Sequence, residues 1–224
     1  MLLRDNWEEF GIRVMEGVSA RQGIDKFPVK GEVFENIIAE TLDFMGVPHI
    51  WNPGSHKPGS DIEIVGEPFS FSVKSAGITG GVRKPHKMSI SSHRLTSHKT
   101  LQEKLAFIDG AGKDYTHYVV LAREDKMKKE VLIKRNYTLL VMPSGVFSVY
   151  ALTWQKNGKS WLTKEKWNDE MGYSMKIENS MSDQFWILGE FNRIKNREDV
   201  KVLGSFSVSA EQLGNTHEIV RRAA

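Results

Sequence analysis

The chain has 224 residues, a net charge of +3 and no cysteine. This length fits one large domain or two small ones, at roughly 100–200 residues per domain. Charged residues make up 26% and hydrophobic residues 40% of the chain, which is ordinary for a globular protein and excludes bulk disorder, collagen and a coiled coil. Without cysteine, a disulfide scaffold, a cysteine nucleophile and a thiolate metal site are also excluded.

Membrane and secretion signals are not expected from this sequence. The apolar runs are short, whereas a transmembrane helix needs about 20 apolar residues. Charged side chains interrupt the N-terminal segment, where a signal peptide needs a continuous apolar stretch; they are Arg4, Asp5, Glu8 and Glu9. We therefore expect an intracellular protein with no membrane partner. The net charge of +3 is compatible with nucleic acid as a partner but does not by itself indicate one.

The first part of the chain is predicted to be helical. Apolar residues recur at helical spacing over residues 3–20 and again over residues 31–46, where Gly46 provides a stop. Residues 21–30 contain a glycine and a proline and are predicted to form a loop between the two helices.

Strand patterns follow the second helix. A short strand is expected at residues 47–50, and the Pro- and Gly-rich segment 52–60 is expected to turn. Two strands are then expected at residues 61–65 and 68–75, on either side of a turn at Gly66–Glu67. The pair is predicted to form an antiparallel hairpin.

Beyond this hairpin, the pattern alternates between basic, helical and strand-like segments. Residues 76–92 are predicted to be a basic loop, and residues 95–108 a third helix. Strands are expected at residues 115–123, 130–133 and 137–143. The order of elements favours a mixed α/β (α+β) fold in which helices flank a mixed sheet.

The C-terminal third is harder to divide and is predicted to mix short strands and helices. Its aromatic residues are more typical of a core than of a base-stacking surface; they are Trp154, Trp161, Trp167 and Trp186. No linker separates this part from the rest. We therefore expect a single domain over residues 1–224, with a core at about 30–143 and a C-terminal elaboration at about 144–224.

Three side chains on this frame are candidates for chemistry. Asp61 opens a strand after the Pro-Gly turn, and Lys74 lies near the end of the next strand. Antiparallel pairing brings these two ends close together. Glu35, on the preceding helix, is expected to reach the same cleft. Strand alternation predicts two faces: Ser70, Ser72 and Lys74 on one, and Phe69, Phe71 and Val73 on the other.

These residue types fit a hard cation and a phosphodiester. Mg²⁺ takes carboxylate, carbonyl and water oxygens, so Asp61, Glu35 through water and the Val73 carbonyl are candidate ligands. Lys74 is a candidate for orienting or helping to deprotonate the attacking water and for offsetting charge on the phosphate. Together they are suited to phosphodiester hydrolysis.

With these residues in place, the segment from residue 30 to about 76 resembles the core of the PD-(D/E)xK nuclease superfamily. That core has a helix bearing Glu, a strand with Asp after a turn, and a following strand that ends in (D/E)xK. The resemblance continues more loosely to about residue 123. It implies a restriction-endonuclease-like fold and Mg²⁺-dependent cleavage of DNA, with Mn²⁺ able to substitute. It assigns Asp61 as the motif Asp, Lys74 as the motif Lys and Glu35 as the helix carboxylate.

Ser72 departs from the pattern, because the superfamily usually has Asp or Glu at that position. Ser72 remains a candidate catalytic residue. The missing carboxylate is expected from Glu35, Glu63 or Glu103, and the helix position favours Glu35. The departure leaves open the number of metal ions and whether the site cleaves at all. A solvated edge lysine, a turn-capping aspartate and an ordinary helix glutamate are the alternatives for the three main residues.

The basic segment 77–100 is predicted to contact DNA. Lys, Arg, Ser and backbone N–H groups bind phosphates, and arginine can read guanine edges in the major groove. The candidates are Arg83, Lys84, Lys87, Ser91, Ser92, His93, Arg94 and Lys99. A solvated basic loop is the alternative. The histidines of this segment are spaced by seven and five residues, which does not fit a helical zinc pair.

A second basic cluster lies at residues 126–135, mixed with acidic residues. A charged hairpin tip explains it as well as DNA binding does. It comprises Lys126, Lys128, Lys129, Lys134 and Arg135, beside Glu124, Asp125 and Glu130.

The sequence therefore favours a type II restriction endonuclease that cleaves double-stranded DNA and leaves 5′ phosphates. Such enzymes usually act as homodimers, because a two-fold protein matches a palindromic site. The resemblance also implies a bacterial or archaeal cytoplasm and a cognate methyltransferase. Two alternatives remain: a repair or recombination nuclease such as a junction resolvase, and a non-cleaving DNA-binding module with a degenerate site.

Overall fold

The structure is a computed structural model that describes residues 2–51, 53, 59–81, 84–181 and 183–215. The helices are α1 (Trp7–Ile24), α2 (Glu32–Phe44), α3 (Leu101–Ala111) and α4 (Phe191–Lys195), with 3₁₀ turns at Leu3–Asp5, Ser144–Val146 and Val149–Ala151. The first five strands are β1 (His49–Trp51), β2 (Ile62–Ile64), β3 (Ser70–Gly81), β4 (Lys84–Arg94) and β5 (His117–Lys128). The others are β6 (Val131–Pro143), β7 (Trp154–Asn157), β8 (Ser160–Thr163), β9 (Tyr173–Glu178), β10 (Gln184–Glu190) and β11 (Lys201–Ser209).

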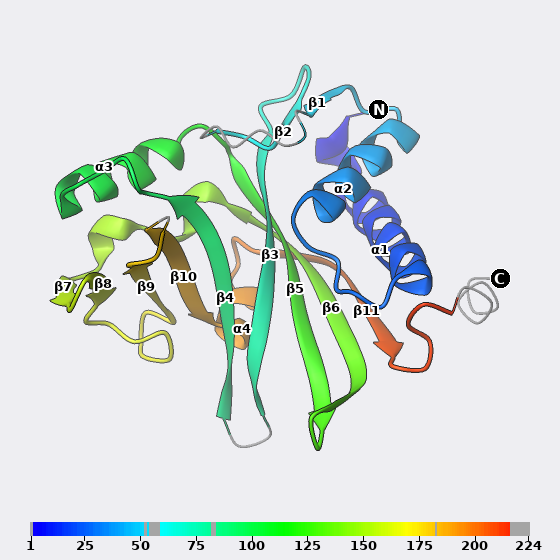
Figure 1. Cartoon of the computed structure of the whole chain (residues 1–224). Helices are drawn as coiled ribbons and strands as arrows, with labels where there is room; N and C mark the ends of the chain where they lie inside the picture. The colour runs from blue at the N-terminus through cyan, green and yellow to red at the C-terminus, as the bar shows by residue number, and fades with distance from the viewer. Residues whose placement is uncertain (1, 52, 54–58, 82–83, 182, 216–224) are drawn as a thin grey trace.

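In the described part of the chain, these strands form one sheet of 11 strands (Figure 1). Its order is β11-β6-β5-β3-β4-β10-β9-β8-β7, with β1 paired to β2 and β2 paired to β3. β3 and β5 are parallel and are connected through β4 and α3, whereas the neighbouring pairs β3–β4 and β5–β6 are antiparallel. This architecture confirms the predicted α/β (α+β) class, in which helices flank a mixed sheet.

The central strands are buried on both faces. On one face, Phe71 and Val73 of β3 join a core with α1 and α2. On the other face, Ala76 and Ile78 of the same strand join a second core that includes α3. This double burial explains the continuous apolar run at residues 118–122 of β5, whose alternate side chains enter the two cores. No helix of the described ranges is long and apolar enough to cross a membrane.

The predicted loop at residues 76–92 is wrong, because β3 continues to Gly81 and β4 begins at Lys84. Ala76, Ile78, Met88 and Ile90 are buried at alternate positions, and each strand therefore presents one apolar face to the core. The half-buried Lys87, which is paired with Thr79, lies on the other face. The basic composition suggested a loop, but the alternation of buried and partly exposed side chains is that of strands.

Three element boundaries also differ from the predicted ones. Residues 21–24, predicted to be a loop, are the last turn of α1. The third helix begins at Leu101 instead of residue 95, because the Thr100 hydroxyl accepts the Glu103 N–H in a capping box. The two strands expected at 130–133 and 137–143 are one strand, β6. The predicted turn at 52–60 is described only at residues 53, 59 and 60, and its other residues lie outside the described part.

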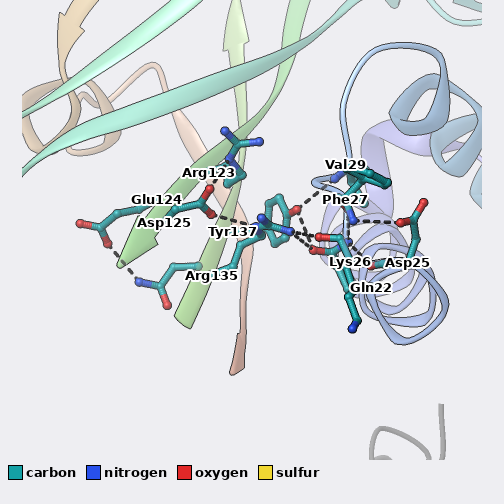
Figure 2. Close-up of polar contacts among 11 residues, drawn as sticks. Gln22, Asp25, Lys26, Phe27, Val29, Arg123, Glu124, Asp125, Arg135 and Tyr137 are labelled. Atoms are coloured by element: carbon teal, nitrogen blue, oxygen red, sulfur yellow. Dashed lines mark hydrogen bonds and ion pairs between the residues drawn. The ribbon is translucent and has the colours of Figure 1, made fainter. Parts of the chain in front are cut away.

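A buried polar network joins the end of α1 to β6 (Figure 2). The Gln22 Oε1 accepts hydrogen bonds from Arg135 Nη1 at 2.9 Å and from the Tyr137 hydroxyl at 3.1 Å. Its Nε2 donates to the Phe27 carbonyl at 2.7 Å, and Arg135 also donates to the Lys26 carbonyl at 2.9 Å. Gln22 is 0% exposed, so these bonds replace the hydrogen bonds to water that burial removes.

The same network fixes the entry to α2. The Val29 N–H donates to the Tyr137 hydroxyl at 3.0 Å. Two residues later, Gly31 takes a φ of +54° immediately before α2, a conformation that favours glycine. The start of α2, and with it the placement of Glu35, is thereby tied to β6.

Gln22→Met tests this network. Methionine has a similar size, but it leaves the Arg135 and Tyr137 donors and the Phe27 carbonyl without their partner. We expect the free energy of unfolding to fall by about 3 kcal/mol, measured by urea unfolding. Gln102→Met, at an exposed position of α3, is the matched control and should change little. Equal stabilities for the two variants would contradict a structural role of the network.

The turn between β5 and β6 is built from unfavourable residues. Lys129 and Glu130 have φ of +48° and +66°, the region that a two-residue hairpin turn usually fills with Asn-Gly. The double substitution Lys129→Asn with Glu130→Gly should therefore raise the free energy of unfolding by about 1 kcal/mol or more. Thermal unfolding measures the effect, and an unchanged or lower Tm would show that the turn is not strained.

Candidate active site

The candidate active site lies at a break along one edge of β3. β2 pairs with β3 at Ser70 and Phe71, and β4 pairs with β3 only from Ala76 onward. Asp61 lies directly before β2, and its N–H donates to the Phe71 carbonyl at 2.7 Å. Its carboxylate Oδ2 accepts the Val73 N–H, also at 2.7 Å. The carboxylate is therefore fixed by the backbone at the point where the sheet edge is open.

Lys74 lies beside this carboxylate, as the predicted hairpin requires. Its Nζ is 3.1 Å from Asp61 Oδ2. The Lys74 and Asp61 side chains are 18% and 23% exposed, so the pair is partly dehydrated but reachable from solvent. The Ser72 hydroxyl donates to the same oxygen at a longer 3.5 Å, and Ser72 is buried.

Glu35 approaches the pair from α2. Partial burial raises the pKa of the Glu35 carboxyl, and the negative charge of Asp61 raises it further. The Trp51 side chain and the positive charge of Lys74 act in the opposite direction. The structure thus brings Glu35, Asp61 and Lys74 into one electrostatically coupled group.

The two other carboxylates considered as replacements for an acid at Ser72 serve different roles. Glu63 is exposed on β2 and accepts the Ser60 hydroxyl at 2.7 Å. Glu103 accepts the N–H groups of Lys99 and Thr100 at the start of α3, and these bonds lower its pKa. The Glu35 carboxyl, in contrast, has a pKa that the charge of Asp61 raises.

The donor set fits a hard cation with few protein ligands. Mg²⁺ is commonly held by one or two carboxylates while it keeps several waters, and Asp61 and Glu35 provide two carboxylates that repel each other. The N–H and the carbonyl of one strand residue point to the same edge, so the Val73 carbonyl faces the break where Asp61 accepts its N–H. In the described ranges, no group of three or more His, Asp or Glu side chains is arranged to hold a metal ion.

The predicted DNA-contacting residues are spread along β4 instead of gathering in a loop. Lys84 and Arg94 are exposed at its two ends, roughly 33 Å apart at the rise of an extended strand. Lys87, Ser91 and Ser92 lie between them and are partly buried, Lys99 is exposed just before α3, and Arg83 lies outside the described residues.

His93, also predicted to contact DNA, lies next to the candidate active site. Its ring packs edge-on against Phe107 and parallel to Phe185, with centroids 5.9 and 6.4 Å apart. Burial and the positive charge of Lys74 lower the pKa of His93 to about 4, and Asp61 opposes this shift. Its Nε2 is buried and forms no hydrogen bond among the described residues. This position depends on the packing of α3 and β10, which sequence spacing does not reveal.

The arrangement combines a partly buried cation, two carboxylates and a backbone carbonyl at one open edge. Such a group can bind a phosphate and a hard cation together, because the lysine offsets negative charge on the phosphate while the carboxylates attract the metal. Comparisons of the chain with protein-family models, with curated proteins and with solved structures find no match.

His93 makes the stability of the fold sensitive to acid. The folded protein has a His93 pKa of about 4 against an ordinary 6.5, so between these values the unfolded chain binds a proton that the folded chain does not. The free energy of unfolding therefore falls as the pH drops through this window.

His93→Phe keeps a ring between Phe107 and Phe185 and removes the titration. We expect the wild type to lose about 3 kcal/mol more than the variant between pH 7 and pH 4. Urea unfolding at both pH values measures the difference. Equal losses in the two proteins would contradict a buried, neutral His93.

Proposed function

We propose that the protein is a Mg²⁺-dependent endonuclease that cleaves double-stranded DNA at specific sequences, in the manner of a type II restriction enzyme. The observation that carries this proposal is the Lys74–Asp61 pair, 3.1 Å apart, with Glu35 coupled to it. The order of elements adds support: α2 is followed by β2 and β3, and then by α3 and by β5, which is parallel to β3. Apart from the additional strands β1 and β4, this is the order that the PD-(D/E)xK resemblance leads one to expect.

Each side chain has a defined role in the proposal. Asp61, Glu35 and the Val73 carbonyl would hold Mg²⁺, which would lower the pKa of a water and offset charge on the phosphate. Lys74, held in place by Asp61, binds a phosphate oxygen and stabilises the charge that develops in the transition state. The Ser72 hydroxyl and the Val73 N–H hold the Asp61 carboxylate in position by hydrogen bonds.

The type II assignment brings further expectations. A homodimer would match a palindromic site, and a cognate methyltransferase would protect the host DNA in a bacterial or archaeal cytoplasm. The second candidate function is a DNA-binding module that does not cleave. It is favoured by one observation: Ser72, where an acid is usual, is buried, and the site thus has two carboxylates instead of three.

Charge-removing variants test the proposal on long duplex DNA with Mg²⁺. The wild type is expected to give discrete fragments, and Asp61→Asn and Lys74→Gln are each expected to slow cleavage by about 100-fold or more. Asp43→Asn is the matched control, because Asp43 is a carboxylate of α2 whose side chain is 79% exposed; it should cut like the wild type.

The contrary outcomes separate the alternatives. Cleavage of branched DNA alone would indicate a junction resolvase. Binding in EDTA without cleavage in Mg²⁺ or Mn²⁺ would indicate the non-cleaving module. If Asp61→Asn and Lys74→Gln both cut at the wild-type rate, the active site lies elsewhere.

A further inference from the structure

Toward its tip, the hairpin of β5 and β6 is no longer paired with the strands on either side. Among the described residues, β3 pairs with β5 only as far as Ile78↔Glu124, and β11 pairs with β6 only as far as Ser209↔Lys134. β5 and β6 continue to pair with each other up to Lys128↔Val131. We call residues 126–134 the ribbon arm. Its base at Lys134 is still paired with Ser209 of β11, and its tip lies at the lower end of the sheet in Figure 1, about level with the ends of β3 and β4.

The ribbon arm carries an excess of positive charge. Its single acid is Glu130. Its four cations are all exposed: Lys126, Lys128, Lys129 and Lys134. The acids at its base are engaged elsewhere. Asp125 pairs with Arg123 and Arg135, and Glu124 accepts a hydrogen bond from Asn136. The arm therefore presents four ammonium groups against one carboxylate.

Several residues of the ribbon arm destabilise it. Lys126 and Lys134 lie directly opposite each other across the two strands, and like charges in this position are destabilising. Lys129 and Glu130 occupy the left-handed region at the tip, which is unfavourable for residues other than Gly, Asn and Asp. Residues that destabilise the fold are therefore concentrated on one exposed segment, which points to a binding role. An anionic partner would offset the repulsion between the lysines.

The shape and the remaining side chains of the arm indicate duplex DNA. The major groove admits a two-stranded β-ribbon, and phosphates line both of its sides. Three exposed apolar side chains lie among the lysines: Met127 at 54%, Val131 at 67% and Ile133 at 47%. Such side chains can contact the floor of a groove, where thymine presents a methyl group. An open groove of about 920 Å³ continues from Lys126 to Lys84 and His86 on β4.

We propose that the ribbon arm enters the major groove of duplex DNA and adds phosphate contacts at a distance from the candidate active site. This inference rests on the proposed function, since it takes DNA as the partner. Val120 is paired with Lys74, and Lys128 lies eight residues further along β5. The arm therefore engages DNA roughly 27 Å from Lys74, about eight base pairs along a duplex.

Binding of DNA in EDTA tests the arm without cleavage. The variant Lys128→Gln with Lys129→Gln removes two charges from the arm. Lys156→Gln with Lys159→Gln removes two exposed lysines at the β7–β8 hairpin and is the matched control. The probe is a fluorescent duplex of about 30 base pairs, longer than the span of the proposed contacts, titrated at several salt concentrations.

We expect the arm variant to bind at least tenfold more weakly than the wild type near 0.15 M salt, since each phosphate that no longer meets a lysine costs about fivefold there. The slope of log K against log salt should fall by about 0.9 for each such phosphate. The control variant should match the wild type in both quantities. Thermal unfolding of both variants shows that weaker binding does not reflect unfolding.

The outcomes separate this inference from the proposed function. If the wild type cuts DNA and the arm variant binds as tightly as the control, the inference fails and the proposed function stands. If the arm variant alone loses affinity and no protein cuts, the inference stands and the proposed nuclease fails. Arm-dependent binding to phosphatidylserine vesicles, without binding to DNA, would overturn the inference by assigning the arm to a membrane surface.

Discussion

The hydrogen bond from the Val73 N–H to the Asp61 carboxylate replaces a strand-to-strand bond. β2 stops pairing with β3 at Phe71, and β4 does not begin until Ala76, so a backbone donor between them needs a side-chain partner. Asp61 supplies that partner at 2.7 Å and is thereby held 3.1 Å from Lys74. The unpaired stretch of this sheet edge thus determines where the Asp61–Lys74 pair lies. Glu35 on α2 and His93 on β4 interact electrostatically with this pair.

The surrounding fold keeps this pair at the boundary between core and solvent. β3 is buried on both faces by two cores, and the Lys74 and Asp61 side chains retain 18% and 23% exposure. Charges in such a position interact more strongly than they would in bulk water, yet a polymer can still reach them. The Gln22–Arg135–Tyr137 network acts at a distance, because it fixes the chain that leads into α2 and therefore Glu35.

Local patterns predicted the hairpin and the approach of Asp61 to Lys74, because a two-residue period and a short turn determine both. They failed at residues 76–92, where the basic composition suggested a loop and obscured the buried positions of Met88 and Ile90 in β4. The setting of His93 was beyond prediction, since it depends on contacts with Phe107 and Phe185 from α3 and β10. The C-terminal strands were predicted only in general terms, because short strands with frequent polar breaks define no register.

The most direct test of the proposed nuclease is to sequence the DNA ends that the wild-type protein produces from a long duplex in Mg²⁺. Hydrolysis at the site of Asp61, Glu35 and Lys74 should release the 3′ oxygen, so the ends should carry 5′ phosphates and ligate without prior phosphorylation. We predict that all ends share one sequence, cut on both strands. Ends scattered over unrelated sequences, or no ends at all, would contradict a sequence-specific nuclease.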